Sequence, residues 1–292
     1  MKTIPIRLLS LLFILLPVIA SADTPSLDLA WKTEKVFQQP ESVVYDLQRN
    51  LLFVSNVNGE PLKADGNGYI SQLSVDGKLI EQHWLTGLDA PKGLALIGDT
   101  LYVADINQLV VIDIKHKNII QRYLVSDAKF LNDVAADAAG NVYVSDMLTN
   151  TIHRLSDGKF EPWIHDDALE FPNGLLVEGD KLIVASWGKM TDGFATAIPG
   201  HLKTIDITGK KIQSLGSKTP VGNLDGLASD GKGNYLVTDW MIGKLFHIMP
   251  NGESTTLVDL EPGSADLTVL KKQKLVIIPI MMSNDIVAYH IK

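Results

Sequence analysis

Residues 132–145 read NDVAADAAGNVYVS, and residues 225–238 read DGLASDGKGNYLVT, so the two stretches are near copies. In each, a polar pair opens a short apolar run that ends at an Asp. A Gly-Asn turn then leads into a second run rich in β-branched and aromatic residues. Two such runs joined by a tight Gly-containing turn predict a pair of antiparallel strands. This hairpin is therefore the unit from which we expect the fold to be built.

The hairpin unit recurs along the whole chain. Successive units are spaced by 51, 40, 41, 52 and 40 residues, and a period near forty residues is typical of propellers or solenoids. The six units begin at Glu41, Lys92, Asn132, Asn173, Asp225 and Ala265.

Each unit has room for two more strands. Third strands are predicted at 108–114, 151–155, 201–207 and 244–248, often with an Asp-Gly or Asn-Gly turn after them. Four antiparallel strands repeated six times predict an all-β, six-bladed β-propeller. The last unit has room for only three strands, so we expect segment 27–37 to supply its outer strand and close the ring.

The N-terminal segment predicts export. Lys2 and Arg7 precede an apolar run at 8–20, and residues 20–22 have the small-residue pattern of a signal peptidase site. We therefore divide the chain into a signal peptide, 1–22, and one propeller domain, 23–292, located in the periplasm or secreted. A retained membrane anchor is the alternative, although the apolar run is short for a stable insertion.

The composition of the chain limits the classes of partner and metal site that it can have. The net charge of −8 disfavours nucleic acid, and the absence of cysteine excludes disulfides and thiolate metal sites. We expect a small-molecule substrate, and the sequence leaves the oligomeric state open.

The first residues of the six units should surround the propeller axis, because the first strand of each blade lines the central channel. Four of them carry side-chain oxygens: Glu41, Asn132, Asn173 and Asp225. Two carboxylates and two amides suit a hard divalent cation, most simply Ca²⁺, with Mg²⁺, Mn²⁺ or Zn²⁺ as alternatives, although zinc is disfavoured by an oxygen-only set. The alternative is that Asn and Asp start strands because they bond their own backbone in turns.

The loop between the second and third strands should overhang the ion. The two long repeats place extra residues there, at 56–67 and 187–201, in blades that face each other across the ring. They predict a substrate gate, or else surface insertions without function.

Strand parity places further side chains at the end of the central channel where the ion is expected. They are either groups that bind or support the substrate, or ordinary strand-end residues. They are Asp105, Asp146, Asp239, Met147, Trp187 and Trp240. Lys92 points into the ring, where it should bind an anionic group or balance nearby carboxylates.

Three motifs in order carry a family resemblance. Asn132-Asp133 with Gly140-Asn141, residues 171–175 (FPNGL) and Asp225-Gly226 resemble the gluconolactonase/regucalcin (senescence marker protein) family of six-bladed propellers. The resemblance implies one catalytic divalent ion, with Glu41, Asn173 and Asp225 as ligands and Asn132 contacting the ion directly or through substrate or water. Segments such as 91–95 (PKGLA) also resemble NHL repeats.

Two functions follow as hypotheses. The first is a metal-dependent hydrolase of a lactone or related ester, in which Asp225, or alternatively Glu41, takes a proton from the attacking water. Asn132 also takes part, and Asp133 supports its neighbour. The second is a non-catalytic propeller that binds a ligand or protein around a structural calcium ion. Phe130 stands where sugar-lactone enzymes of the family commonly carry an arginine.

Overall fold

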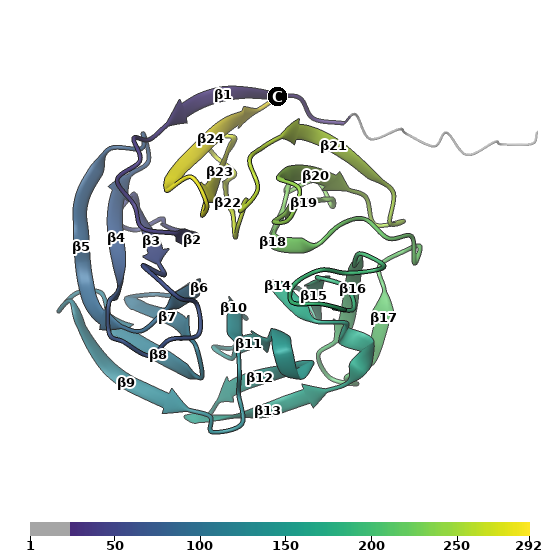
Figure 1. Cartoon of the computed structure of the whole chain (residues 1–292), viewed down its shortest axis with the longest axis horizontal. Helices are drawn as coiled ribbons and strands as arrows, with labels where there is room; N and C mark the ends of the chain where they lie inside the picture. The colour runs from purple at the N-terminus through teal and green to yellow at the C-terminus, as the bar shows by residue number, and fades with distance from the viewer. Residues whose placement is uncertain (1–23) are drawn as a thin grey trace, which may run out of the picture.

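Six four-stranded antiparallel sheets stand around a central axis (Figure 1). The computed structural model describes residues 24–292, so the signal peptide predicted at 1–22 lies outside the described residues. Within each sheet the strands follow chain order from the axis outward, apart from the sheet that combines the first and the last described strands. The all-β, six-bladed propeller predicted from the repeat is confirmed.

The six blades follow one another along the chain. Blade 1 contains β2 (Pro40–Asp46), β3 (Leu51–Asn56), β4 (Gly68–Ser74) and β5 (Leu79–Leu88), and blade 2 contains β6 (Pro91–Ile97), β7 (Thr100–Asp105), β8 (Gln108–Asp113) and β9 (Asn118–Leu124). Blade 3 contains β10 (Leu131–Ala136), β11 (Val142–Asp146), β12 (Thr151–Ser156) and β13 (Lys159–His165), and blade 4 contains β14 (Pro172–Glu178), β15 (Lys181–Ser186), β16 (Leu202–Asp206) and β17 (Ile212–Ser214). Blade 5 contains β18 (Leu224–Ser229), β19 (Tyr235–Asp239), β20 (Lys244–Ile248) and β21 (Ser254–Asp259), and blade 6 contains β22 (Thr268–Leu270), β23 (Leu275–Ile280), β24 (Asp285–Ile291) and β1 (Leu27–Lys32).

Helical structure in the described part of the chain is limited to two 3₁₀ turns, η1 (Met147–Thr149) and η2 (Asp167–Leu169). Between residues 24 and 292 there is no helix with the length and apolar character needed to span a membrane.

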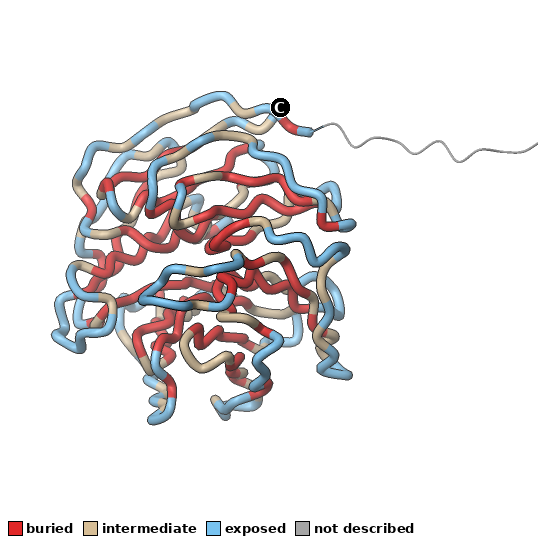
Figure 2. The backbone as a smooth tube through the Cα atoms, turned by 45° about the vertical axis from the view of Figure 1, so that its right-hand side comes forward, coloured by how far each residue is buried: buried red, intermediate tan, exposed pale blue. Residues whose placement is uncertain are grey.

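The hydrophobic core lies between neighbouring blades. Six clusters of buried side chains each join two adjacent sheets, as where Phe53 and Trp84 of blade 1 meet Leu94 and Val103 of blade 2. Second strands such as β3 are buried on both faces, which explains why they read as continuous apolar runs rather than alternating ones. Figure 2 shows buried residues running through the strands and exposed residues on loops and outer strands.

The N-terminal strand closes the ring as the sequence predicts. β1 pairs antiparallel with β24, from Leu27 opposite Ile291 to Lys32 opposite Val287. The strand is shorter than the predicted segment 27–37, because the chain must then cross from the outside of blade 6 to the inner strand of blade 1. Phe37, on that crossing, is fully buried between the two blades.

Blade 6 departs from the repeat at its inner edge. Its first strand, β22, starts at Thr268, three residues later than the unit that begins at Ala265. Here the backbone N–H of Asp266 donates to the carbonyl of Glu41 at 2.9 Å. The N–H of Ala265, one residue earlier, donates to the carbonyl of Pro279 in its own blade at 3.1 Å. The inner edge of blade 6 is therefore bonded both to its own sheet and to blade 1.

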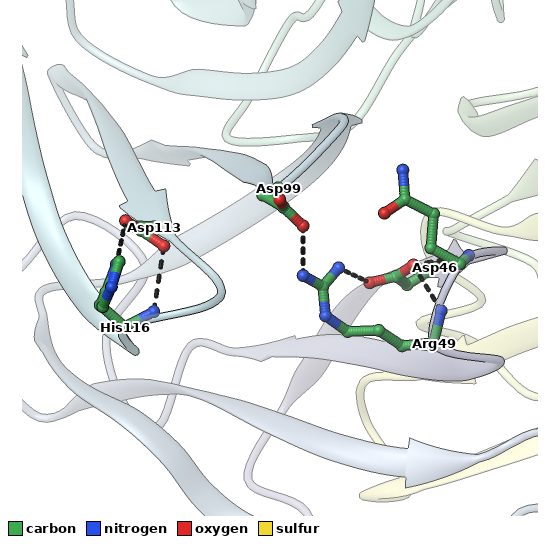
Figure 3. Close-up of polar contacts among 6 residues, drawn as sticks. Asp46, Arg49, Asp99, Asp113 and His116 are labelled. Atoms are coloured by element: carbon green, nitrogen blue, oxygen red, sulfur yellow. Dashed lines mark hydrogen bonds and ion pairs between the residues drawn. The ribbon is translucent and has the colours of Figure 1, made fainter.

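Charged side chains connect blades at the turns between first and second strands. Arg49 donates from Nη1 to Asp46 Oδ2 at 2.7 Å within blade 1, and its Nη2 pairs with Asp99 in blade 2 (Figure 3). The same figure shows the local pair between His116 and Asp113. These bonds are partly or fully exposed, so solvent screening keeps the contribution of each to stability small.

Candidate metal centre

A β-bulge aims the candidate ligands at the axis. In blades 1 to 5, two residues of the inner strand stand opposite one residue of the second strand. Bulges of this kind redirect side chains and are common beside functional sites. The first residue of each bulge is the one that the repeat placed on the axis: Glu41, Lys92, Asn132, Asn173 and Asp225.

Hydroxyl groups stabilise three of the bulges. The N–H of the second bulge residue donates to Ser55 Oγ in blade 1, to Ser145 Oγ in blade 3 and to Thr238 Oγ1 in blade 5, at 2.8–2.9 Å. The extra residue leaves this N–H without a partner in the strand ladder, so a hydroxyl on the facing strand replaces it. These Ser and Thr residues were not singled out from the sequence, although their shared position in the repeat was visible there.

The five bulge residues line one cavity of about 200 Å³ at the axis. All four candidate ligands are at least 94% buried. Asn173 Nδ2 donates to Asp225 Oδ2 at 3.0 Å, and Asn132 Nδ2 contacts Met147 Sδ at 3.7 Å. Both amides therefore keep their side-chain oxygen free. Ala265, the sixth unit start, is buried and lies outside the cavity wall.

The donor set fits a hard divalent cation. Glu41 Oε2 and Asp225 Oδ1 are buried and have no hydrogen-bond partner. A buried carboxylate oxygen without a partner is costly, and a cation bound among these oxygens would remove that cost. The described residues contain no cluster of three or more His, Cys, Asp or Glu side chains able to hold a metal, so the two amides must complete the set.

Electrostatics support the same reading. Burial raises the pKa of the Glu41 carboxyl well above its usual value, and the charge of Asp225 adds to the effect. Burial likewise raises the pKa of Asp225, with Asp266 adding and the Asn173 hydrogen bond opposing. Two neighbouring carboxyl groups that are costly to ionise keep their protons. A divalent cation bound between them would replace those protons and stabilise the ionised carboxylates.

A glycine permits the ligands of blades 4 and 5 to approach. A Cβ on Gly174 would lie 2.1 Å from the carbonyl oxygen of Asp225 and 3.2 Å from Leu227 Cβ. Only a residue without a side chain fits there, beside both Asn173 and Asp225. The Asn-Gly pair at 173–174 is thus a packing requirement of the site.

Lys92 lies in the cavity wall with most of its donors used. Its Nζ donates to the carbonyls of Ala90 at 2.8 Å and Pro61 at 3.0 Å, and lies 4.7 Å from the ring centroid of Phe130. Burial lowers the pKa of Lys92 to about 8, against the opposing charges of Glu41 and Asp105. One N–H remains to face the cavity.

Two more acids lie deeper in the channel. Asp133 accepts the backbone N–H groups of Val134 and Leu175 at 2.6 Å, and Asp266 accepts the hydroxyl of Ser42 at 2.5 Å. Both line a second pocket rather than the cavity. Asp133 therefore connects blade 3 to blade 4 behind the ligands, which agrees with a supporting position. Burial raises the pKa of Asp133 well above its usual value and that of Asp266 to about 7.

The strand-end acids do not reach the cavity. Asp146 is fully buried and accepts the N–H groups of Lys129 and Phe130, both at 3.0 Å. Asp105 and Asp239 bond in the same way to the loops that enter their own blades. Asp146 thus fixes the backbone of Phe130, a cavity residue, and does not itself face the cavity.

Apolar side chains make up most of the cavity wall. Trp187 and Trp240, expected near the mouth, line it together with Met147, Phe130 and Phe194. The two long loops also contribute, Pro61 from blade 1 and Phe194 from blade 4, and these blades lie on opposite sides of the ring (Figure 1). Phe194 and the methionines at 281 and 282 carried no repeat signal, and the sequence reasoning missed them.

Comparisons with known proteins agree with this architecture. Among solved structures, the chain is similar to the "Crystal structure of Nidogen/Laminin Complex", with 16% sequence identity, a TM-score of 0.57, and coverage of 76% of this chain and 80% of that one. At this identity the likeness shows the fold alone. No curated protein matches. The model of the SMP-30/Gluconolactonase/LRE-like region matches residues 39–268, and the chain therefore belongs to the SMP-30/gluconolactonase/LRE-like family.

Proposed function

We propose that this gluconolactonase-like propeller is a divalent-metal-dependent hydrolase of a lactone or related ester, with Ca²⁺ as the metal. The observation that carries the proposal is the pair of buried, unpartnered oxygens on Glu41 and Asp225. They lie in the polar part of a cavity that has space for a small molecule. An ion held only for structure needs no such space next to it.

The residues that would hold the ion are Glu41, Asn132, Asn173 and Asp225. When bound there, a divalent cation supplies Lewis-acid polarisation of the substrate carbonyl. Asn173 keeps Asp225 oriented through its 3.0 Å hydrogen bond. Asn132 offers its amide oxygen to the ion or to the attacking water. The apolar walls keep bulk water away from the reacting bond.

The reaction consumes one water for each ester bond. The water oxygen attacks the carbonyl carbon, and the bond from that carbon to the ester oxygen breaks. Asp225 takes a proton from the water and returns it to the departing oxygen. A lactone therefore opens to a hydroxy acid, with no other reactant required.

Turnover of a lactone and ester panel tests the proposal, measured with added Ca²⁺ and with EDTA. We expect hydrolysis that EDTA abolishes, and at least about a hundredfold lower kcat/KM in Asp225→Asn. Asp137→Asn is the matched control. It also removes one negative charge, but Asp137 lies in the turn between β10 and β11, at the end of blade 3 away from the cavity. A chain that binds Ca²⁺ but turns over nothing would instead be a binding propeller with a structural ion.

Export is a further proposal, resting on the segment at 1–22. N-terminal sequencing of protein recovered from a host that secretes it should begin at Asp23. Recovery of intact chain starting at Met1 would contradict it.

A further inference from the structure

Four aromatic side chains form a continuous row along the cavity. Ring centroids are 6.2 Å apart for Phe130 and Phe194, 6.0 Å for Phe194 and Trp187, and 6.1 Å for Trp187 and Trp240. These separations are typical of aromatic pairs in contact. Since the four residues come from the loops of blades 3, 4 and 5, they form one apolar surface shared by three blades.

Most polar groups within this wall already have partners. The indole N–H of Trp187 donates to the carbonyl of Phe194 at 2.9 Å. Lys92 gives two N–H groups to backbone carbonyls, and Gln39 Oε1 accepts the N–H of Gly59 at 2.6 Å. Apart from the candidate ligands, the cavity can therefore offer a substrate one Lys92 N–H, the Gln39 amide nitrogen and the indole N–H of Trp240.

Methionine side chains extend the apolar lining of the cavity. Met147, Met281 and Met282 line it, and flexible thioether side chains adapt to apolar ligands of varied shape. At the mouth, Phe194 and Met282 stay 41% and 62% exposed. An apolar surface therefore continues from solvent to the candidate metal centre.

We infer that the substrate is a lactone or ester with an apolar alkyl or aryl arm, and not a polyhydroxylated sugar lactone; this inference rests on the proposed function. The ester carbonyl lies at the polar end, among the candidate ligands and Lys92. The arm lies along the aromatic row. Hydroxyl groups on such an arm would lose their hydrogen bonds to water and find no partners in the apolar walls, which weakens binding.

The size of the cavity agrees with this substrate. Its volume of about 200 Å³ exceeds the about 150 Å³ of an apolar cavity that admits benzene. One ring with a short arm therefore fits, and longer arms reach the exposed residues at the mouth.

Binding of unreactive lactams tests the inference without turnover. We would titrate the Ca²⁺-loaded protein by calorimetry with δ-lactams carrying no arm, an ethyl arm or a butyl arm, and with a polyhydroxylated δ-lactam. Each methylene should raise affinity about fourfold, and the polyhydroxylated compound should bind at least tenfold more weakly than the butyl one. A flat series, or tighter binding of the polyhydroxylated lactam, overturns the inference.

Two variants locate the arm. Trp240→Ser and the more exposed Met282→Ser should each reduce the advantage of the butyl arm at least threefold, while Ile120→Ser on the outer strand β9 should leave it unchanged. An unchanged advantage in both cavity variants overturns the inference. Turnover of the matching lactones is measured separately. If affinity rises with arm length but no lactone is hydrolysed, only the hydrolase proposal is refuted. If lactones are hydrolysed but affinity does not change with arm length, only the choice of substrate is refuted.

Discussion

Replacing Gly174 with alanine should force apart the inner strands of blades 4 and 5 and weaken cation binding at the axis. The new Cβ would lie 2.1 Å from the carbonyl oxygen of Asp225, more than 1 Å inside ordinary contact. No flexible side chain can move away to relieve it, because the obstacle is backbone. Strand β18 must therefore shift by about 1 Å, and overpacking of this kind costs about 3 kcal/mol of unfolding free energy.

The same shift reaches the candidate ligands. The hydrogen bond from Asn173 to Asp225 crosses this junction, so we expect Ca²⁺ affinity to fall at least about tenfold. Urea unfolding and calorimetry measure the two effects. Gly209→Ala is the control, because its Cβ meets only the exposed side chain of Asp206, with Oδ1 at 3.0 Å and Cγ at 3.7 Å, and it should cost less than about 0.5 kcal/mol. Equal stability and equal Ca²⁺ affinity in the two variants would refute the argument from close approach.

Three further predictions concern the scaffold. Asp146→Ala should leave two backbone N–H groups unpartnered and lose about 2–3 kcal/mol in urea unfolding while keeping Ca²⁺ affinity; unchanged stability would contradict this. In EDTA, the free energy of unfolding should fall as pH rises from about 4 to about 7. The Asp266 carboxyl has a pKa of about 7 in the folded chain and about 3.9 in the unfolded chain. Its protonated form therefore stabilises the fold fully below about pH 4, and this contribution is lost above about pH 7. A flat profile over that range would argue against buried, protonated acids. Deleting residues 24–32 should expose the edge of β24 and lower the Tm by more than about 10 °C, with aggregation on heating; an unchanged Tm would show that β1 does not close the ring.

The fold and the axial positions were predictable because both follow from the repeat. Each blade must bury two faces and turn inward at the same point, so Asn132 and Asp225 occupy equivalent places in similar segments. The bulge itself was not predicted, because the inner strands are buried on both faces at this point and show no apolar–polar alternation that an extra residue would interrupt. The hydroxyls of Ser55, Ser145 and Thr238 were the available signal.

The cavity wall was only partly predictable. Strand parity placed Trp187 and Trp240 near the mouth, and the structure has them there. It placed Asp146 there as well, but that carboxylate turns back to bond the loop that carries Phe130, which parity cannot foresee. Phe194 lies in an inserted loop without a counterpart in other blades, so no periodicity could position it.

Calcium titration of the EDTA-treated protein by calorimetry tests the central claim most directly. We predict one Ca²⁺ per chain in the wild type and in the control Asp137→Asn. Binding should be lost in Asp225→Ala and in Glu41→Gln, because each removes one of the two carboxylates that now have an unpartnered oxygen. Equal Ca²⁺ binding by all four proteins, or none by the wild type, would contradict the assignment of the axial cavity as a metal centre.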